Sequence, residues 1–189
     1  MDFEILIKEI KDDIEEERLE AELPPSFLMH CNSHTFEEDH KRSLLAWWML
    51  KEELLKRGIN PYKVELQYGK EGKPYIEGFP FNIAHSGKMV ILLISEKECG
   101  VDIERIASRP PFDRMAKKVF SPKENEVYNA SKDKPDTFIY LWSRKEAFRK
   151  KSGVGISDFS LLREDTPSSV VSKKIQDSLG SSYWLSYLL

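Results

Sequence analysis

Cysteine is scarce in this chain, with only Cys31 and Cys99 among 189 residues. Two cysteines without the short spacing of metal ligands exclude a disulfide framework and a structural zinc site. We therefore expect a protein of a reducing compartment.

Long apolar runs are missing as well. No stretch reaches the roughly 20 apolar residues that a membrane-spanning helix needs. The opening residues, MDFEILIKEIKDDIEEERLE, alternate charged and apolar side chains and lack the basic segment and apolar segment of a secretion signal. We expect a soluble, cytoplasmic protein with no membrane partner.

Positive charge is not in excess. The chain has 29 Lys and Arg against 32 Asp and Glu, whereas a dedicated nucleic-acid binder usually carries a basic face. This balance argues against nucleic acid as the partner and leaves room for a local basic patch. The apolar content of 40% predicts a folded core, in one large domain or two small ones.

The chain alternates helix and strand patterns. An acidic helix pattern ends at Pro24, a long apolar helix pattern follows to Gly58, and another long helix pattern ends at Gly153. Strand patterns occupy residues 62–68, 81–86, 88–95, 99–106, 156–162 and 183–189. This order predicts an α+β fold of two halves, residues 1–97 and 98–189.

The segment CGVDIERI, residues 99–106, places two carboxylates two positions apart directly after an apolar run. In a strand, residues i and i+2 point to the same face, so Asp102 and Glu104 converge while Val101 and Ile103 face the core. Carboxylates this close repel each other unless a cation lies between them. The pattern indicates a cation site; the alternative is a solvated strand edge.

A third carboxylate lies on the last helix pattern. Glu146 stands at the edge of its apolar stripe, and Lys150 follows one turn later on the same side. The alternative interpretation of this pair is an ordinary surface ion pair.

Two further segments could hold an anion. His85 stands where a strand enters a tight turn with Ser86 and Gly87, so that side chains and backbone N–H groups can face a ligand. Lys73 lies in the rigid turn EGKP. Each signal is weak alone, because a single histidine or a turn is usually structural.

Taken together, four blocks resemble the signature motifs of the 4′-phosphopantetheinyl transferases of the surfactin-synthetase-activating type: EGKPYIEGFPFNIAHSGKMV, GVDIE, FSPKE and WSRKEAFRK. The resemblance implies a pseudo-dimer of two similar α+β halves with the active site between them. It also implies transfer of the phosphopantetheine arm of coenzyme A to a serine of an acyl or peptidyl carrier protein. Such transfer uses Mg²⁺ and releases adenosine 3′,5′-bisphosphate.

The resemblance also implies roles for individual residues. The metal ligands would be Asp102, Glu104 and Glu146, which suit a hard cation. The proton acceptor would be Glu146, or alternatively Glu104, and Lys150 would offset charge on the pyrophosphate. The contacts to coenzyme A would come from Arg42, Ser43, Lys73, His85, Ser86 and Lys150. Basic residues that usually hold the 3′-phosphate are missing around His30.

Partner and role assignments stay open at several points. An acidic carrier protein would dock on the basic segments RMAKKVF and FRKKSG, and the protein would act as a monomer. Glu124 matches a family glutamate near the reacting centre, yet it also fits a capping box from Ser121. Alternative functions are an Mg²⁺-dependent nuclease and a catalytically weak relative that binds coenzyme A or carrier protein.

Overall fold

The computed structural model describes residues 3–11, 13–33, 36–69, 71–106, 111–153 and 163–189. Its first sheet is antiparallel with the order β1-β5-β4, formed by β1 (Phe3–Glu9), β5 (Met89–Ser95) and β4 (Phe81–Ser86). The central strand, β5, is buried along its whole length, as its continuous apolar sequence predicts.

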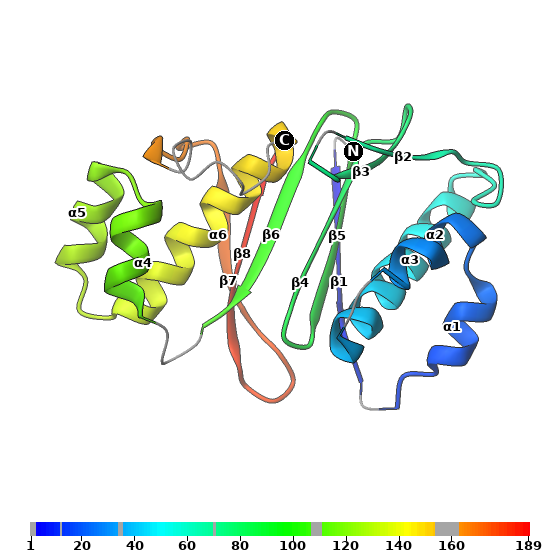
Figure 1. Cartoon of the computed structure of the whole chain (residues 1–189), viewed down its shortest axis with the longest axis horizontal. Coiled ribbons are helices and arrows are strands. Elements are labelled where there is room, and N and C mark those ends of the chain that lie inside the picture. The colour runs from blue at the N-terminus through cyan, green and yellow to red at the C-terminus, as the bar shows by residue number, and fades with distance from the viewer. Residues whose placement is uncertain (1–2, 12, 34–35, 70, 107–110, 154–162) are drawn as a thin grey trace.

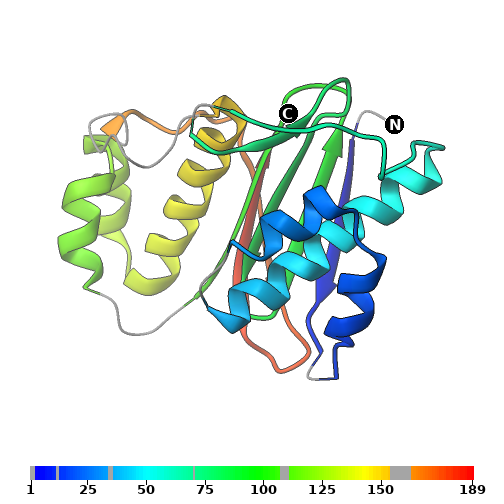
Figure 2. The ribbon, with the colours of Figure 1, turned by 45° about the vertical axis from the view of Figure 1, so that its right-hand side comes forward.

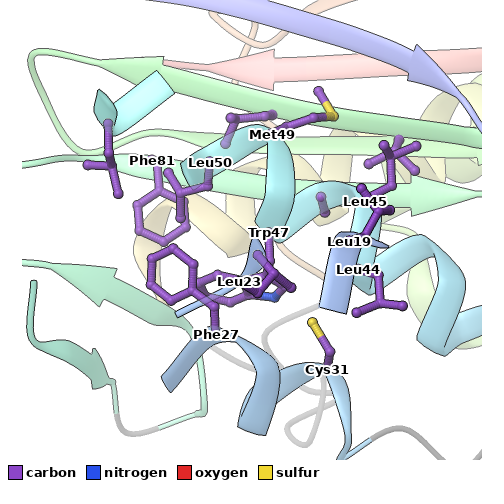
Figure 3. Close-up of a cluster of buried hydrophobic side chains, with 14 of the residues drawn as sticks. Leu19, Leu23, Phe27, Cys31, Leu44, Leu45, Trp47, Met49, Leu50 and Phe81 are labelled. Atoms are coloured by element: carbon purple, nitrogen blue, oxygen red, sulfur yellow. The ribbon is translucent and has the colours of Figure 1, made fainter. Parts of the chain in front are cut away.

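Three helices cover the first sheet: α1 (Glu16–Glu22), α2 (Pro25–Cys31) and α3 (Glu37–Lys56). α3 packs on β5, and the two shorter helices pack on α3. Trp47 of α3 contacts Phe27 and Phe81, with ring centroids 4.7 and 6.1 Å away (Figure 3). Burial of each such side chain contributes about 1.5–3 kcal/mol, so this cluster fixes α3 against the sheet.

The second sheet has the order β6-β8-β7, formed by β6 (Gly100–Arg105), β8 (Ser182–Leu188) and β7 (Val171–Gln176). α6 (Lys134–Ser152) crosses it and ends at Gly153, which adopts the left-handed conformation (φ 65°). α4 (Phe112–Val119) and α5 (Pro122–Ala130) pack against α6 (Figure 1). A separate two-stranded sheet joins β2 (Leu66–Tyr68) and β3 (Pro74–Ile76).

Both large sheets follow the same order, in which the last strand of each half lies between its first strand and the preceding strand. The sheets lie between two helical layers, with α3 on one side and α6 on the other (Figures 1 and 2). An α+β fold is confirmed. The shared order is what a pseudo-dimer requires, but the pseudo-dimer itself and the division after residue 97 stay predictions.

The sheets meet where β4 runs beside β6. The Asn82 side chain accepts a hydrogen bond from Val101 N (2.8 Å), and the Ser86 hydroxyl accepts one from Arg105 N (3.1 Å). Apolar side chains of both sheets, including Ile91 and Ile103, form a shared core. The junction is therefore rigid, because backbone donors of β6 are satisfied by side chains of β4.

Some predicted elements differ from the structure. The segment after Pro24 is a helix, α2, because proline is tolerated in the first helical turn. The strand predicted at 62–68 covers only Leu66–Tyr68, and β7 had no prediction. The strand predicted at 156–162 lies outside the described residues. No helix in the described ranges combines the length and apolarity needed to cross a bilayer.

Candidate active site

The paired carboxylates of β6 lie under α6. Val101 and Ile103 are buried in the core between the sheets, so Asp102 and Glu104 point to the opposite face, where α6 crosses. Gly100 permits this close crossing, because a Cβ there would lie 2.1 Å from the Ala147 carbonyl oxygen. A side chain at position 100 would therefore push α6 away from the carboxylates.

α6 brings a third carboxylate and a cation to the same place. The Lys150 ammonium lies 2.7 Å from Asp102 Oδ1. Asp102 is 5% exposed and Glu146 is 6% exposed. The interpretations as a solvated strand edge and as a surface ion pair between Glu146 and Lys150 are therefore wrong. The Lys150 ammonium on α6 pairs instead with Asp102, a buried residue of β6.

Burial and mutual repulsion perturb these carboxylates. Burial, together with the nearby Asp102 charge, raises the pKa of Glu104 to about 7 and the pKa of Glu146 to about 7. Burial also raises the pKa of Asp102, and Lys150 opposes that increase. Three carboxyl groups that resist ionisation in one volume need a positive charge.

The unsatisfied oxygens fit a metal ion. Within the described part of the chain, Asp102 Oδ2 and Glu146 Oε1 are buried without a hydrogen-bond partner. In the same ranges, no group of three or more His, Cys, Asp or Glu side chains is arranged so that it could hold a metal ion. The oxygen donors nevertheless suit Mg²⁺, which accepts few protein ligands. The oxygens of Asp102 and Glu146 are thus suitable donors, and the metal site of Asp102, Glu104 and Glu146 stays a prediction, with Lys150 as the positive charge beside Asp102 in this arrangement.

Two adjoining cavities open beside this cluster, where α6 approaches β4 and the start of β3. One, of about 190 Å³, is lined by Ser43 and Trp47 of α3, by His85 of β4 and by Lys150. The other, of about 410 Å³, is lined by the turn with Lys73 and by Glu146, Arg149 and Lys150 of α6. Both share Pro74, Asn82, Ile83 and Lys150.

The cavities bring together Ser43, Lys73, His85 and Lys150, four of the six residues expected to contact coenzyme A. The other two lie elsewhere. Ser86 lies near Glu104, with its hydroxyl 3.3 Å from Glu104 Oε2. Arg42 donates to Asp39 (2.7 Å) and to the Gly87 carbonyl (2.9 Å), and lines a different cavity. The contact expected between Arg42 and the nucleotide is not supported by this placement.

Sequence reasoning missed several residues at the site. His30, Trp47 and Asn82 line the smaller cavity, and His30 stacks on Tyr68 with its Nδ1 3.1 Å from the tyrosine hydroxyl. Arg149 received no role in the sequence analysis beyond its place in the segment FRKKSG, and it is 5% exposed. Its position three residues after Glu146 was the available signal, because such residues share a helix face.

Glu124 is held in structural contacts. Its carboxylate accepts from Ser121 N (2.9 Å), and Ser121 Oγ accepts from Glu124 N (3.1 Å), which confirms the capping box. The same carboxylate pairs with the buried Lys145 ammonium (2.9 Å) and accepts from the Thr166 hydroxyl (2.6 Å). Both oxygens of Glu124 thus connect α5, α6 and the segment before β7.

Comparison with known proteins identifies the class to which this arrangement belongs. A sequence model of the 4′-phosphopantetheinyl transferase superfamily matches residues 98–187, which include β6 and α6. A 4′-phosphopantetheinyl transferase of Bacillus subtilis is 33% identical over 149 residues, 76% of this chain and 66% of that protein. The 4′-phosphopantetheinyl transferase Sfp of Bacillus subtilis strain 168 is 33% identical over 150 residues, with the same shares.

A third relative is the 4′-phosphopantetheinyl transferase AcpT of Salmonella typhimurium, 38% identical over 114 residues, 57% of this chain and 59% of that protein. The chain belongs to the 4′-phosphopantetheinyl transferase superfamily. The matched regions span 66% of the length of the two Bacillus relatives.

Proposed function

We propose that this chain transfers the 4′-phosphopantetheine arm of coenzyme A to a serine hydroxyl of an acyl or peptidyl carrier protein in the cytoplasm. Adenosine 3′,5′-bisphosphate is the other product. The observation that carries the proposal is the contact of Lys150, which lines both cavities, with the buried Asp102, next to the buried Glu146, which lines the larger cavity. The two Bacillus subtilis relatives are named as 4′-phosphopantetheinyl transferases, which supports the transfer of this group.

Asp102, Glu104 and Glu146 would hold Mg²⁺. When bound, the ion supplies positive charge to the pyrophosphate oxygens and to the phosphorus under attack. Asp102 Oδ2 and Glu146 Oε1, which have no partner among the described residues, support this assignment.

The first half and α6 would bind coenzyme A together. Ser43 lines the smaller cavity, where the resemblance implies that it lies beside the adenine. Lys73, His85 and Lys150 line the two cavities at positions where they can face phosphate oxygens. The ammonium of Lys150 would move from Asp102 to the pyrophosphate and offset the negative charge that grows there.

A carboxylate would accept the proton of the carrier serine hydroxyl, provided that its pKa lies near neutral pH. Burial raises the pKa of Glu104 and of Glu146 to about 7 in the metal-free structure, and a general base is most effective when its pKa lies near the working pH. Glu104 accepts a hydrogen bond from Ser86, whereas Glu146 lines the larger cavity, through which a carrier serine can approach. Glu146 is therefore the proposed base, and His85 orients the cofactor.

The carrier protein would dock beside α4. Arg114, Lys117 and Lys118 are exposed on this helix, where they can meet an acidic partner. The second predicted docking segment, FRKKSG, is not a free basic surface. Arg149 is buried, and Lys151 donates to the Leu189 carbonyl (2.6 Å).

Product analysis separates this function from its alternatives. The chain is incubated with coenzyme A and Mg²⁺, with and without an apo-carrier protein, and the nucleotides are separated by chromatography. We expect adenosine 3′,5′-bisphosphate only when the carrier is present. Cleavage of single- or double-stranded DNA or RNA in parallel reactions would favour the nuclease alternative. Tight coenzyme A binding without product would favour the catalytically weak relative.

A further inference from the structure

Arg149 is a buried arginine whose guanidinium keeps unsatisfied donors within the described ranges. Its side chain leaves α6 near the end of the helix, and the residue is 5% exposed. Its Nε and Nη2 atoms are buried and have no hydrogen-bond partner among the residues that the structure describes. Burial of an unpaired guanidinium is costly, so such a group normally has a ligand or a partner.

The neighbouring cations of α6 are already engaged. Arg144 donates to the Val170 carbonyl (2.6 Å), and Lys145 pairs with Glu124 (2.9 Å). Lys151 donates to the Leu189 carbonyl (2.6 Å). These three side chains fasten α6 to the rest of its half. Arg149 makes no such contact within the described ranges, which argues against a purely structural role.

Arg149 lines the larger of the two cavities, of about 410 Å³. Lys150 and Glu146 line it from the same helix, and Lys73 lines it from the turn before β3. The Lys73 ammonium already contacts the Cys99 carbonyl (3.1 Å) and Lys150 contacts Asp102 (2.7 Å). Arg149 therefore lines a cavity together with two other cations, and two of its donors have no partner among the described residues.

We propose that Arg149 binds a phosphate oxyanion of coenzyme A in this cavity, as a third cation beside Lys73 and Lys150. The proposal rests on the proposed function and goes beyond the residues that the motifs assign. A guanidinium presents paired N–H donors that match two oxygens of one phosphate. Because Lys150 and Glu146 line the same cavity, the phosphate concerned is one of the pyrophosphate group and not the 3′-phosphate.

Calorimetric titration tests this assignment with three probes: coenzyme A, dephospho-coenzyme A and inorganic pyrophosphate. The variants are Arg149→Met, Arg149→Lys and, as a matched control, Arg18→Met, whose arginine is exposed on α1. We expect Arg149→Met to weaken binding of all three probes about 10- to 100-fold, the range for hydrogen bonds to charged groups. Arg149→Lys should lose less, and Arg18→Met should bind like the wild type.

Thermal unfolding without ligand separates binding from folding. Removal of an unpaired buried charge should leave the melting temperature of Arg149→Met equal to or above that of the wild type. A lower melting temperature with wild-type affinity for coenzyme A would make Arg149 a structural residue and overturn the proposal.

The probes also separate the possible failures. If Arg149→Met weakens coenzyme A binding but leaves dephospho-coenzyme A binding unchanged, Arg149 contacts the 3′-phosphate and the pyrophosphate assignment is wrong. If the wild type binds neither coenzyme A nor pyrophosphate, the proposed function fails and this inference fails with it.

Discussion

Lys150→Met removes the positive charge that faces Asp102 in the arrangement described here. The ammonium lies 2.7 Å from Asp102 Oδ1, and the methionine side chain keeps much of the length and apolar contact of lysine. The variant therefore removes one charge with little loss of packing. Asp102 would then be a buried carboxylate whose second oxygen already has no partner in the described ranges.

The size of the effect follows from the burial of the two partners. Breaking a fully buried ion pair costs about 3–5 kcal/mol. The Asp102 side chain is 6% exposed, but that of Lys150 is 32% exposed, so water screens part of the interaction. We expect a loss of about 2 kcal/mol in the free energy of unfolding, which lowers the melting temperature of a chain of this size by about 4–8 °C.

Thermal unfolding at neutral pH, with a chelator or with excess MgCl₂, measures this effect. In the chelator, Lys150→Met should melt below the wild type, while Lys123→Met, an exposed control on α5, should not. Mg²⁺ should raise the melting temperature of Lys150→Met more than that of the wild type, because the carboxylates have lost their internal cation. Equal melting temperatures in the chelator, or equal increases with Mg²⁺, would refute this reasoning.

Three further predictions follow from the same contacts. Glu124→Gln leaves the Lys145 ammonium without a charged partner and should cost about 1–3 kcal/mol of stability; an unchanged melting temperature with a large loss of kcat would instead assign Glu124 to the chemistry. Gly100→Ala places a Cβ 2.1 Å from the backbone of α6 and should lower both the melting temperature and turnover; wild-type stability would contradict the tight crossing. The pKa values of Glu104 and Glu146 are about 7, against an ordinary 4.5. The metal-free fold should therefore lose stability as the pH rises from about 4.5 to about 7, because each carboxyl group ionises less readily in the fold than in the unfolded chain. The melting-temperature increase caused by Mg²⁺ should accordingly be small at about pH 5.5 and large at about pH 8, and an increase that does not change with pH would contradict these pKa values.

The local patterns of the sequence predicted the elements that carry the site. The alternation in GVDIE placed Val101 and Ile103 in the core and both carboxylates on the other face, because a strand has a side-chain period of two. The apolar stripe of α6 and the left-handed Gly153 likewise defined that helix and its end. Such features depend on neighbouring residues only.

Contacts between distant segments could not be predicted in the same way. Lys150 is one turn from Glu146 in the sequence, yet its ammonium pairs with Asp102, because the crossing of α6 over β6 decides which acid lies nearer. Arg149 reads as a surface residue, since arginine is seldom fully buried. α2 was missed because a proline pair ends one helix and also begins the next.

The central claim is that the chain moves the phosphopantetheine arm to a carrier serine with Asp102 and its neighbouring carboxylates. The most direct measurement is the intact mass of an apo-carrier protein after incubation with coenzyme A, Mg²⁺ and either the wild type or Asp102→Ala. Both enzymes are first checked for matching far-UV circular dichroism. We predict that the wild type increases the carrier mass by one phosphopantetheine group and that Asp102→Ala does not. An unmodified carrier with the folded wild type, across fatty-acid, polyketide and peptide carriers, or full modification by Asp102→Ala, would contradict the account.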